Sequence, residues 1–287
     1  MNSISAPKIS VLIVTYNNEA TIGACLDSLS RQTFESFETL VWDNGSIDST
    51  IDVLSRYRNI RHTNSPRNIG FAAAVNRLAE KAQGKYLFIL NPDCSCQPNT
   101  LENLERFSQS HAGAVSPALV FPNGAVQPSA RRFPSIKNYI FSRRSPFGTL
   151  GYFDFAKAGF IIPDKPSMVP FVSATALFIE KELFDDVGRF DERFFLYYED
   201  LDLCRRLYER NIPVWYLPDL RVVHLLRASS RKTPIRSLYY HHRALFKYFT
   251  KYNPHKYINN IALFFLMVGV FFFSMLIYLT GIRSSHD

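Results

Sequence analysis

Residues 10–17 read Ser-Val-Leu-Ile-Val-Thr-Tyr-Asn, a short apolar run that ends abruptly in polar side chains. Residues 39–43 (Thr-Leu-Val-Trp-Asp) and 86–93 (Tyr-Leu-Phe-Ile-Leu-Asn-Pro-Asp) have the same form. We interpret each run as a buried strand of an open parallel sheet. Ligands bind in such sheets at the carboxyl ends of the strands. The sequence therefore predicts a ligand site where these three strands end.

The wider pattern alternates strands with helices, which implies right-handed crossovers and a parallel sheet. In the first part of the chain we expect strands at 9–15, 37–42, 60–63 and 85–90, and helices at 19–31, from about Ser46 or Asp48, and at 70–82. Residues 121–170 lose the pattern and are expected to form a long functional loop. Beyond the loop we expect strands at 175–179, 214–217 and 221–224 and helices at 181–187, 199–210 and 234–252.

The C-terminal segment is strongly apolar, with no charged residue from Ile261 to Ile282. As a helix it is about 33 Å long, enough for a bilayer core of roughly 30 Å. We expect a membrane span here in preference to a buried core helix. Residues 1–7 lack the features of a signal peptide. The predicted organisation is an α/β domain (1–230), a basic juxtamembrane segment (231–257), a transmembrane helix (258–283) and a short tail (284–287).

Basic residues are concentrated before this span. Nine Lys or Arg and no acid lie between Leu220 and Asn260, which accounts for the whole net charge of +8. Because only Arg283 is basic beyond the span, the positive-inside rule predicts a single-pass protein of the inner (plasma) membrane with a cytoplasmic domain. The basic run is expected to attract anionic membrane lipids. Nucleic acid is the rival partner for a pI near 9.3, and the adjoining span favours the membrane.

The helix expected at 234–252 is amphipathic. Leu238, Leu245 and Phe249 share one face, and four basic residues share another: Arg236, Arg243, Lys247 and Lys251. This pattern suits an interfacial helix that lies against the bilayer.

The four cysteines form no obvious cofactor motif. Cys25, Cys94, Cys96 and Cys204 show neither a CxxC pair nor the spacing of zinc ligands. We expect reduced thiols.

The ends of the first two strands carry candidate nucleotide-binding residues. A carboxylate such as Asp43 can accept the imide N–H of uracil or thymine, and Tyr16 can stack on the base. Asp43-Asn44-Gly45-Ser46 is also a favourable turn sequence, and both interpretations stay open. Asn68-Ile69-Gly70 resembles a phosphate-facing helix start. A GxGxxG fingerprint and a Walker lysine are both absent, which disfavours a dehydrogenase and a phosphoryl transferase.

Two further segments suggest a cation and a general base. Asp93 follows a strand directly and can bind Mg²⁺ or Mn²⁺ together with a diphosphate, unless it caps the next helix. His224, at a later strand end, is either another metal ligand or a surface histidine. Glu199, Asp200 and Asp202 follow an aromatic run, where low polarity and like charges favour a general base. Capping of the helix by these acids is the alternative.

In order and spacing, these segments resemble glycosyltransferase family 2, in particular its bacterial rhamnosyltransferase-type members. The resemblance extends from about Ile9 to Ser230. It rests on the motifs at 10–17, 42–50 (Trp-Asp-Asn-Gly-Ser-Ile-Asp-Ser-Thr), 68–76 (Asn-Ile-Gly-Phe-Ala-Ala-Ala-Val-Asn), 90–93 (Leu-Asn-Pro-Asp), 188–206 (Gly-Arg-Phe-Asp-Glu-Arg-Phe-Phe-Leu-Tyr-Tyr-Glu-Asp-Leu-Asp-Leu-Cys-Arg-Arg) and 222–224 (Val-Val-His).

The resemblance implies a GT-A fold (Rossmann-like, with a mostly parallel sheet), a nucleotide-sugar donor, a divalent cation and inversion at the anomeric carbon. It implies a catalytic base at Asp200, with Glu199 as the second candidate, and a cation held by Asp93 and His224. Donor-binding roles fall on Thr15, Tyr16, Asn17, Asp43, Asn68 and Asn91. Asn91 stands where the family's metal motif often begins with Asp, so one carboxylate is left for the cation. Arg227 replaces a Gly of many relatives.

We therefore predict transfer of a sugar, with rhamnose from dTDP-rhamnose as the family-level expectation. The expected acceptor is a saccharide on polyprenyl diphosphate, in the synthesis of a surface glycan such as O-antigen or capsule. Arg131, Arg132 and Arg227 are candidates to meet its diphosphate headgroup. A polyprenyl-phosphate sugar synthase and a non-catalytic, membrane-tethered nucleotide-sugar-binding protein are the alternatives.

Overall fold

The computed structural model describes residues 6–135, 159–225 and 234–252, and also 264, 265, 268, 269, 271, 272 and 275. Its first half contains β1 (Ile9–Thr15), α1 (Ile22–Ser30), β2 (Phe37–Asp43), α2 (Thr50–Leu54), β3 (Ile60–Asn64), α3 (Phe71–Lys81), β4 (Tyr86–Leu90), β5 (Cys94–Cys96), α4 (Thr100–Ser110) and β6 (Ala114–Val120). The second half contains β7 (Ala130–Arg131), β8 (Phe160–Ile161), β9 (Ser167–Met168), β10 (Phe171–Val172), β11 (Ala176–Glu180), α8 (Lys181–Asp186), α9 (Glu199–Glu209), β12 (Val214–His224) and α10 (Pro234–Tyr252).

The described residues form a nine-stranded sheet in the order β3-β2-β1-β4-β11-β6-β12-β5, with β9 paired to β12. A second, three-stranded antiparallel sheet has the order β10-β7-β8. The pairs β3–β2, β2–β1, β1–β4 and β6–β12 are parallel. The pairs of β11 with β4 and β6, and of β12 with β5 and β9, are antiparallel. The larger sheet is therefore mixed. The predicted parallel arrangement is correct for β3-β2-β1-β4 and for the pair β6–β12, and wrong for the other pairs.

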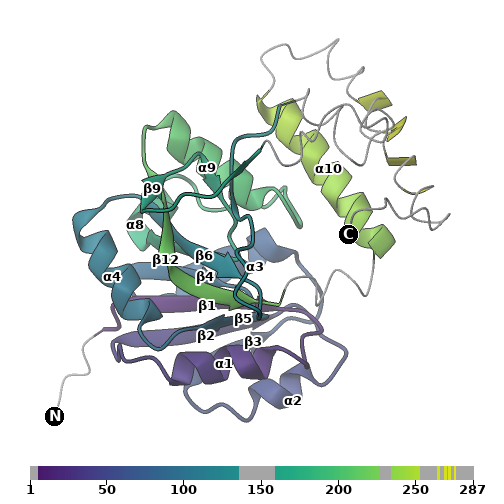
Figure 1. Ribbon diagram of the computed structural model, residues 1–287. Coiled ribbons are helices and arrows are strands. Elements are labelled where there is room, and N and C mark those ends of the chain that lie inside the picture. Colours follow the sequence, from purple (N-terminus) through teal and green to yellow (C-terminus); the bar gives the residue numbers. More distant parts are fainter. Residues whose placement is uncertain are drawn as a thin grey trace.

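Helices cover both faces of this sheet (Figure 1). Every residue of β1 is buried, because it lies inside the sheet and packs on both sides. Ile9, Val11 and Ile13 face one core, which also contains residues of α1, α2 and α4. Leu12 and Val14 face the other core, with residues of α3, α8, α9 and α10. This period-two division of one strand between two cores explains the uninterrupted apolar run at the start of the chain.

The structure confirms most expected elements and corrects two. The second helix begins at Thr50 instead of near Ser46, because Ser46 stays in the preceding turn and donates to Asp43. The two strand pieces expected at 214–217 and 221–224 are one strand, β12, whose register with β6 shifts between Leu217 and Arg221. The long loop predicted over 121–170 contributes β7, β8 and β9 in its described parts.

Helix α10 has the predicted bounds and a different environment. Leu245 and Phe249 are buried in the core beside α9, so this face is not free to meet a bilayer. Burial of two such side chains contributes about 3–6 kcal/mol. Lys247 and Lys251 also turn towards the domain, where they contact Arg193, Asp191 and Asp202. The prediction that the apolar face of α10 lies against the bilayer is therefore wrong, because this face packs on the protein core.

Among the described residues, we find no helix with the length and apolar character needed for a membrane span. Most of the predicted span, 258–283, lies outside the described residues, as do Arg227 and the tail.

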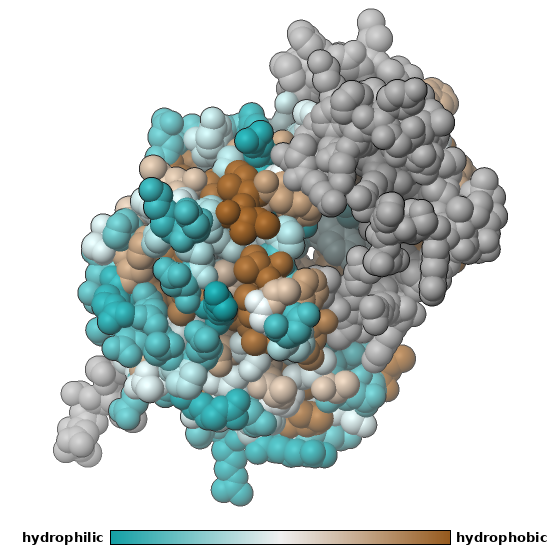
Figure 2. Space-filling view, in the orientation of Figure 1, coloured by the Kyte–Doolittle hydropathy of each residue, from teal (hydrophilic) through white to brown (hydrophobic). Residues whose placement is uncertain are grey.

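On the face of the molecule drawn in Figure 2, polar side chains cover most of the coloured surface, and apolar ones gather near its middle.

Candidate active site

The carboxyl end of β2 holds a fully buried acid. The carboxylate of Asp43 accepts hydrogen bonds from the backbone N–H of Gly45 (3.1 Å) and of Ser46 (2.9 Å) and from the Ser46 hydroxyl (2.5 Å). These bonds support the turn interpretation of the sequence Asp-Asn-Gly-Ser. Asp43 is 0% exposed, so its carboxylate does not reach the surface. The role of Asp43 in donor binding stays a prediction.

The end of β1 lies directly beside this turn. The carbonyl of Thr15 accepts from Asn44 N–H (2.8 Å), and the backbone N–H of Asn17 donates to Ser46 (2.8 Å). Asn17 has a φ of 55°, a left-handed conformation that asparagine tolerates. Tyr16 is half-buried and interacts with Arg236 of α10. The structure thus brings Thr15, Tyr16, Asn17 and Asp43 together, as the sequence predicted.

Asn68 and Asn44 shape the start of α3. Asn68 accepts from the N–H of Gly70 (2.9 Å), and Asn44 donates to the Gly70 carbonyl (3.2 Å). Gly70 has a φ of 90°, and a Cβ there would lie 2.6 Å from the carbonyl oxygen of Phe195, so only glycine fits. The N–H of Phe71 donates to that same carbonyl (2.8 Å). This first N–H of α3 is therefore already paired, which weakens the prediction that the helix start binds phosphate.

A second cluster of polar groups lies where β4, β5 and β12 meet. His224 Nε2 is 3.4 Å from Asp93 Oδ1, and both side chains are buried. His224 Nδ1 lies 2.8 Å from Gln127 Oε1, while Gln127 Nε2 donates to the His224 carbonyl (2.6 Å). The Gln127 oxygen can only accept, so Nδ1 is the donor in this contact, and Nε2 is the ring nitrogen that faces Asp93 and could bind a cation. Cys94 completes a group of three side chains that could hold an ion.

Two alternatives from the sequence are wrong. His224 is 6% exposed, so it is not a surface histidine. Asp93 does not cap the next helix, because α4 begins at Thr100 with Asn99 as its N-cap. Sequence reasoning missed Gln127, since nothing local marks a glutamine 97 residues before its histidine partner. Asn91 contacts this region through its backbone, whose N–H donates to the Thr175 carbonyl (2.9 Å).

The third group is the acidic start of α9. Asp200 accepts from the backbone N–H of Ala174 (3.2 Å) and of Leu201 (2.8 Å). Burial raises the pKa of Asp200 above its ordinary value, while these N–H groups and the charge of Arg131 act in the opposite direction. Burial and the neighbouring Asp200 raise the pKa of Glu199 much further, and its Oε2 has no hydrogen-bond partner. Burial thus favours the protonated form of Glu199 more strongly than that of Asp200, which makes Asp200 the better candidate for a base.

The dipeptide Ala174-Thr175 connects Asp200 to the group of Asp93, Cys94 and His224, which we call the cation cluster. The N–H of Ala174 donates to Asp200, and the carbonyl of Thr175 accepts from Asn91 and lies 3.8 Å from the sulfur of Cys94. Because β2, β1 and β4 are neighbours in the sheet, their three ends lie within two strand spacings of about 4.8 Å each. The strand ends that lead to Asp43 and Asp93 therefore lie at one edge of the sheet, and a joint role of these acids with Asp200 stays a prediction.

Strained backbone precedes the acids of α9. Tyr197 and Tyr198 have φ values of 69° and 70°, which is uncommon for aromatic residues and typical of functional sites. Helix α10 supports this segment. The Tyr197 hydroxyl is 2.6 Å from Ser237, and the rings of Phe195 and Tyr240 stack at 4.7 Å.

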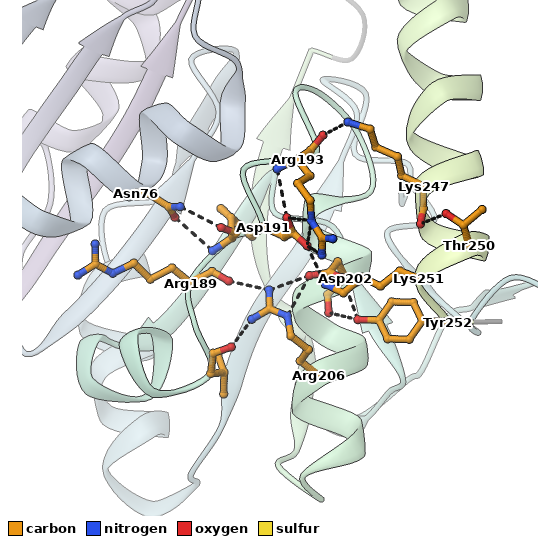
Figure 3. A network of polar contacts seen from close by, with 12 residues as sticks. Asn76, Arg189, Asp191, Arg193, Asp202, Arg206, Lys247, Thr250, Lys251 and Tyr252 are labelled. Atoms are coloured by element: carbon orange, nitrogen blue, oxygen red, sulfur yellow. Dashed lines mark hydrogen bonds and ion pairs between the residues drawn. The ribbon is translucent and has the colours of Figure 1, made fainter. Parts of the chain in front are cut away.

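Asp202, the third acid of this motif, has a structural role (Figure 3). Its fully buried carboxylate is bound by Lys251 (2.5 Å), Tyr252 (2.8 Å) and Arg206 (2.9 Å). Lys251 also pairs with Asp191 (2.8 Å). The network ties α10 to α9.

Arg131 and Arg132, two of the arginines expected to meet the acceptor, differ in their relation to Asp200. Arg131 lies 4.4 Å from the ring centre of Phe160, and its charge acts on Asp200. Arg132 is exposed, and its backbone N–H donates to Gly159 (2.8 Å). Arg131 is therefore a neighbour of the candidate base, whereas the structure shows no contact of the Arg132 side chain with the site.

Comparison with known proteins agrees with this geometry. The model of the family described as "Glycosyl transferase family 2" matches residues 10–163, more than half of the chain. N-acetylglucosaminyl-diphospho-decaprenol L-rhamnosyltransferase of Mycobacterium tuberculosis is 31% identical over 253 residues, which cover 83% of this chain and 82% of that protein. This chain belongs to glycosyltransferase family 2. The resemblance found in the sequence motifs is confirmed, and the protein is a glycosyltransferase.

Other relatives of the transferase are more distant. The O-antigen biosynthesis protein RfbC of Myxococcus xanthus is 28% identical over 80% of this chain, although the match spans only 18% of RfbC. The mannosyltransferase PcManGT of Pyrobaculum calidifontis, solved with GDP-Man and Mn²⁺, has a TM-score of 0.59 at 17% identity and covers 98% of this chain and 77% of its own. S. aureus TarS, solved with UDP-GlcNAc, has a TM-score of 0.58 at 18% identity, and the match covers 96% of this chain and 76% of the TarS chain. These two structures show the fold alone, a GT-A-like mixed α/β sheet.

Proposed function

We propose that this glycosyltransferase moves rhamnose from dTDP-rhamnose to a saccharide carried on a polyprenyl diphosphate, with inversion at the anomeric carbon. The observation that carries the proposal is the shared edge of the sheet, where Asp93, His224 and Asp200 converge through Ala174 and Thr175. A donor whose diphosphate binds at Asp93 and His224 would have its sugar next to Asp200. The rhamnosyltransferase name of the mycobacterial relative supports this donor and this class of acceptor.

Asp200 acts as the general base in the proposed reaction. It takes the proton of the acceptor hydroxyl as that oxygen attacks the anomeric carbon and the nucleoside diphosphate leaves on the opposite side. Such assistance is typically worth 10²–10⁴-fold in rate. Arg131 and two backbone N–H groups stabilise the ionised form of Asp200, the form that accepts a proton, against the effect of burial. Glu199 is the weaker candidate, because burial and the Asp200 charge raise its pKa and no side chain among the described residues lowers it.

Asp93 and His224 would hold the divalent cation, Mg²⁺ or Mn²⁺. The donor set fits a cation, because a buried carboxylate and the Nε2 nitrogen of His224 face each other at 3.4 Å. When bound, the ion supplies Lewis-acid stabilisation of the leaving diphosphate. Gln127 keeps the ring of His224 in the binding tautomer. Tyr16, Asn17 and Asp43 lie at the neighbouring strand ends, where the nucleotide would bind.

The proposal extends to the place of the enzyme in the cell. The uncharged run from Ile261 to Ile282 supports a single membrane span, and the basic run before it supports a domain at the cytoplasmic face of the inner membrane. There the enzyme would meet a lipid-linked acceptor for a surface glycan such as O-antigen. Exposed basic residues, Arg132 and Arg243 among the described ones, are available for anionic lipids.

A donor and acceptor panel tests the proposal. The purified full chain is supplied with dTDP-rhamnose, UDP-galactofuranose, UDP-GlcNAc or GDP-mannose. The acceptor is GlcNAc-diphospho-prenol, prenyl phosphate or soluble GlcNAc. We expect labelled rhamnose on the first acceptor only. Labelling of prenyl phosphate would instead identify a polyprenyl-phosphate sugar synthase, and equal transfer to soluble GlcNAc would contradict the lipid-linked acceptor.

A further inference from the structure

The cation cluster contains a sulfur ligand that the sequence did not reveal. One ligand atom each of Asp93, Cys94 and His224 lie within 4.8 Å of one another, and all three side chains are buried. Asp93 and His224 already account for the carboxylate and imidazole of the proposed cation site. The Cys94 thiol is the additional group.

Strand pairing explains why Cys94 is part of this cluster. Strands β5 and β12 are antiparallel, and Cys94 lies directly opposite His224 in the register. Residues opposite one another in an antiparallel pair point to the same face, with their Cβ atoms about 5 Å apart. The backbone N–H of Leu225 donates to the Asp93 carbonyl (3.1 Å) and holds the two strands together at this point. The sheet therefore positions Cys94 and His224, and Asp93 lies in the turn that leads directly into β5.

We propose that Cys94 is a third protein ligand of the cation held by Asp93 and His224, and that its sulfur makes the site prefer Zn²⁺ or Co²⁺ to Mg²⁺. Thiolate, imidazole and carboxylate together are a zinc-type donor set, whereas Mg²⁺ prefers oxygen ligands and retained water. When Sγ coordinates, the thiol proton leaves to solvent and the S–metal bond replaces it. This inference deepens the metal site of the proposed function and is independent of the donor sugar and the acceptor.

The other thiol in β5 provides a matched control. Cys96 is also buried, lies two residues from Cys94, and does not belong to the cluster. Its backbone N–H donates to Ser28 (3.0 Å), on the side of α1. Replacing either cysteine by serine removes one buried sulfur from the same short strand, so the two variants share any general effect on packing.

Cobalt binding gives a readout that does not depend on transferase activity. The full chain, freed of metal, is titrated with Co²⁺ while the sulfur-to-cobalt charge-transfer band is followed in the near ultraviolet. We expect this band in the wild-type protein and in C96S, and its loss in C94S with some Co²⁺ binding retained. In competition titrations, C94S should bind Zn²⁺ at least about tenfold more weakly, while its affinity for Mg²⁺ changes little.

Two results would overturn the proposal. Absence of the charge-transfer band in the wild-type protein at saturating Co²⁺ would show that no thiolate binds the ion, even if C94S proved unable to fold. An unchanged band in folded C94S would assign the sulfur to another cysteine. Sugar transfer to the wrong acceptor, by contrast, would contradict the proposed function and leave the Co²⁺ spectrum as expected.

Discussion

Two adjacent acids at the start of α9 differ because their surroundings differ. Asp200 has two backbone donors and a nearby arginine, whereas Glu199 has an unpaired buried oxygen and the Asp200 charge beside it. Burial raises the pKa of both groups, and in the described part of the chain only Asp200 has both hydrogen-bond donors and a nearby positive charge that oppose this rise. The sequence alone left the choice between them to a family resemblance.

This difference makes a prediction for the two isosteric variants. D200N should bind the nucleotide-sugar donor normally and lose transfer by about 10²–10⁴-fold, because no group remains to accept the hydroxyl proton. E199Q should keep most of its activity, since a protonated glutamate and a glutamine have similar hydrogen-bonding groups. Donor affinity and single-turnover rates measure the two effects separately. Near-normal turnover of D200N would remove Asp200 from its role.

Arg131 should control the pH dependence of the reaction. A general base must be deprotonated, so activity falls as the pH drops through the pKa of Asp200, which burial already raises. The charge of Arg131 lowers this pKa, so its removal in R131Q should move the acid limb of the kcat/KM profile to higher pH. R132Q, a change at an exposed neighbour, should leave the position of the limb unchanged. A limb that stays in place in R131Q would contradict the proposed coupling.

Gln127 is predicted to act through His224. Loss of its carbonyl in Q127A frees the ring to rotate or change tautomer, and such outer partners typically contribute 10–100-fold in metal affinity. Metal affinity should fall by this factor, as measured by Co²⁺ or Mn²⁺ titration. Q109A, on the distant helix α4, is the control and should bind metal normally. Equal affinities of the two variants would show that Gln127 does not position the histidine.

At the scale of elements, α10 is part of the catalytic domain. Its ring and hydroxyl contacts lie on the strained segment before α9, and its last turn supplies Lys251 and Tyr252 to buried Asp202. An amphipathic pattern with a basic face suggested a lipid surface. The pattern cannot distinguish a bilayer from a protein core as the cover of the apolar face, because both remove it from water.

Lys251 should contribute both stability and activity. K251M removes a charged hydrogen bond to a carboxylate that is 0% exposed, so the free energy of unfolding should fall by about 2 kcal/mol. Weaker docking of α10 should also lower turnover, because α10 supports Tyr197 and Tyr198. Urea denaturation measures the first effect. R243M, at an exposed position of the same helix, should change stability by less than about 0.5 kcal/mol. An equal loss in the two variants would contradict the role of the buried network.

At the scale of the molecule, the boundary between the catalytic unit and the membrane segment should fall after α10. A chain ending at residue 257 keeps all described contacts of α10 with the domain and loses the uncharged run. We expect it to transfer sugar to a short, water-soluble lipid-linked acceptor and to leave the membrane fraction. A chain ending at residue 233 lacks α10 and should lose transfer. Flotation with vesicles and a transfer assay report the two properties, and full activity of the shorter chain would contradict the prediction.

The sequence by itself determined the order of the elements and the polar strand ends. Apolar periodicity and turn residues act over a few positions, so β1, α3, α9 and α10 could be predicted nearly to the residue. The strand ends at Asp43 and Asn91–Asp93 followed from the same local signals.

Only the tertiary structure decided which side chains meet. Gln127 and His224 are 97 residues apart, Lys251 and Asp202 are 49 apart, and Cys94 faces His224 only through the pairing of β5 with β12. It also decided that half of the sheet is antiparallel and that α10 packs on protein. The reason is physical: hydrophobic periodicity sets the local conformation of each segment, whereas long-range partners depend on strand order and register, which a single sequence does not express.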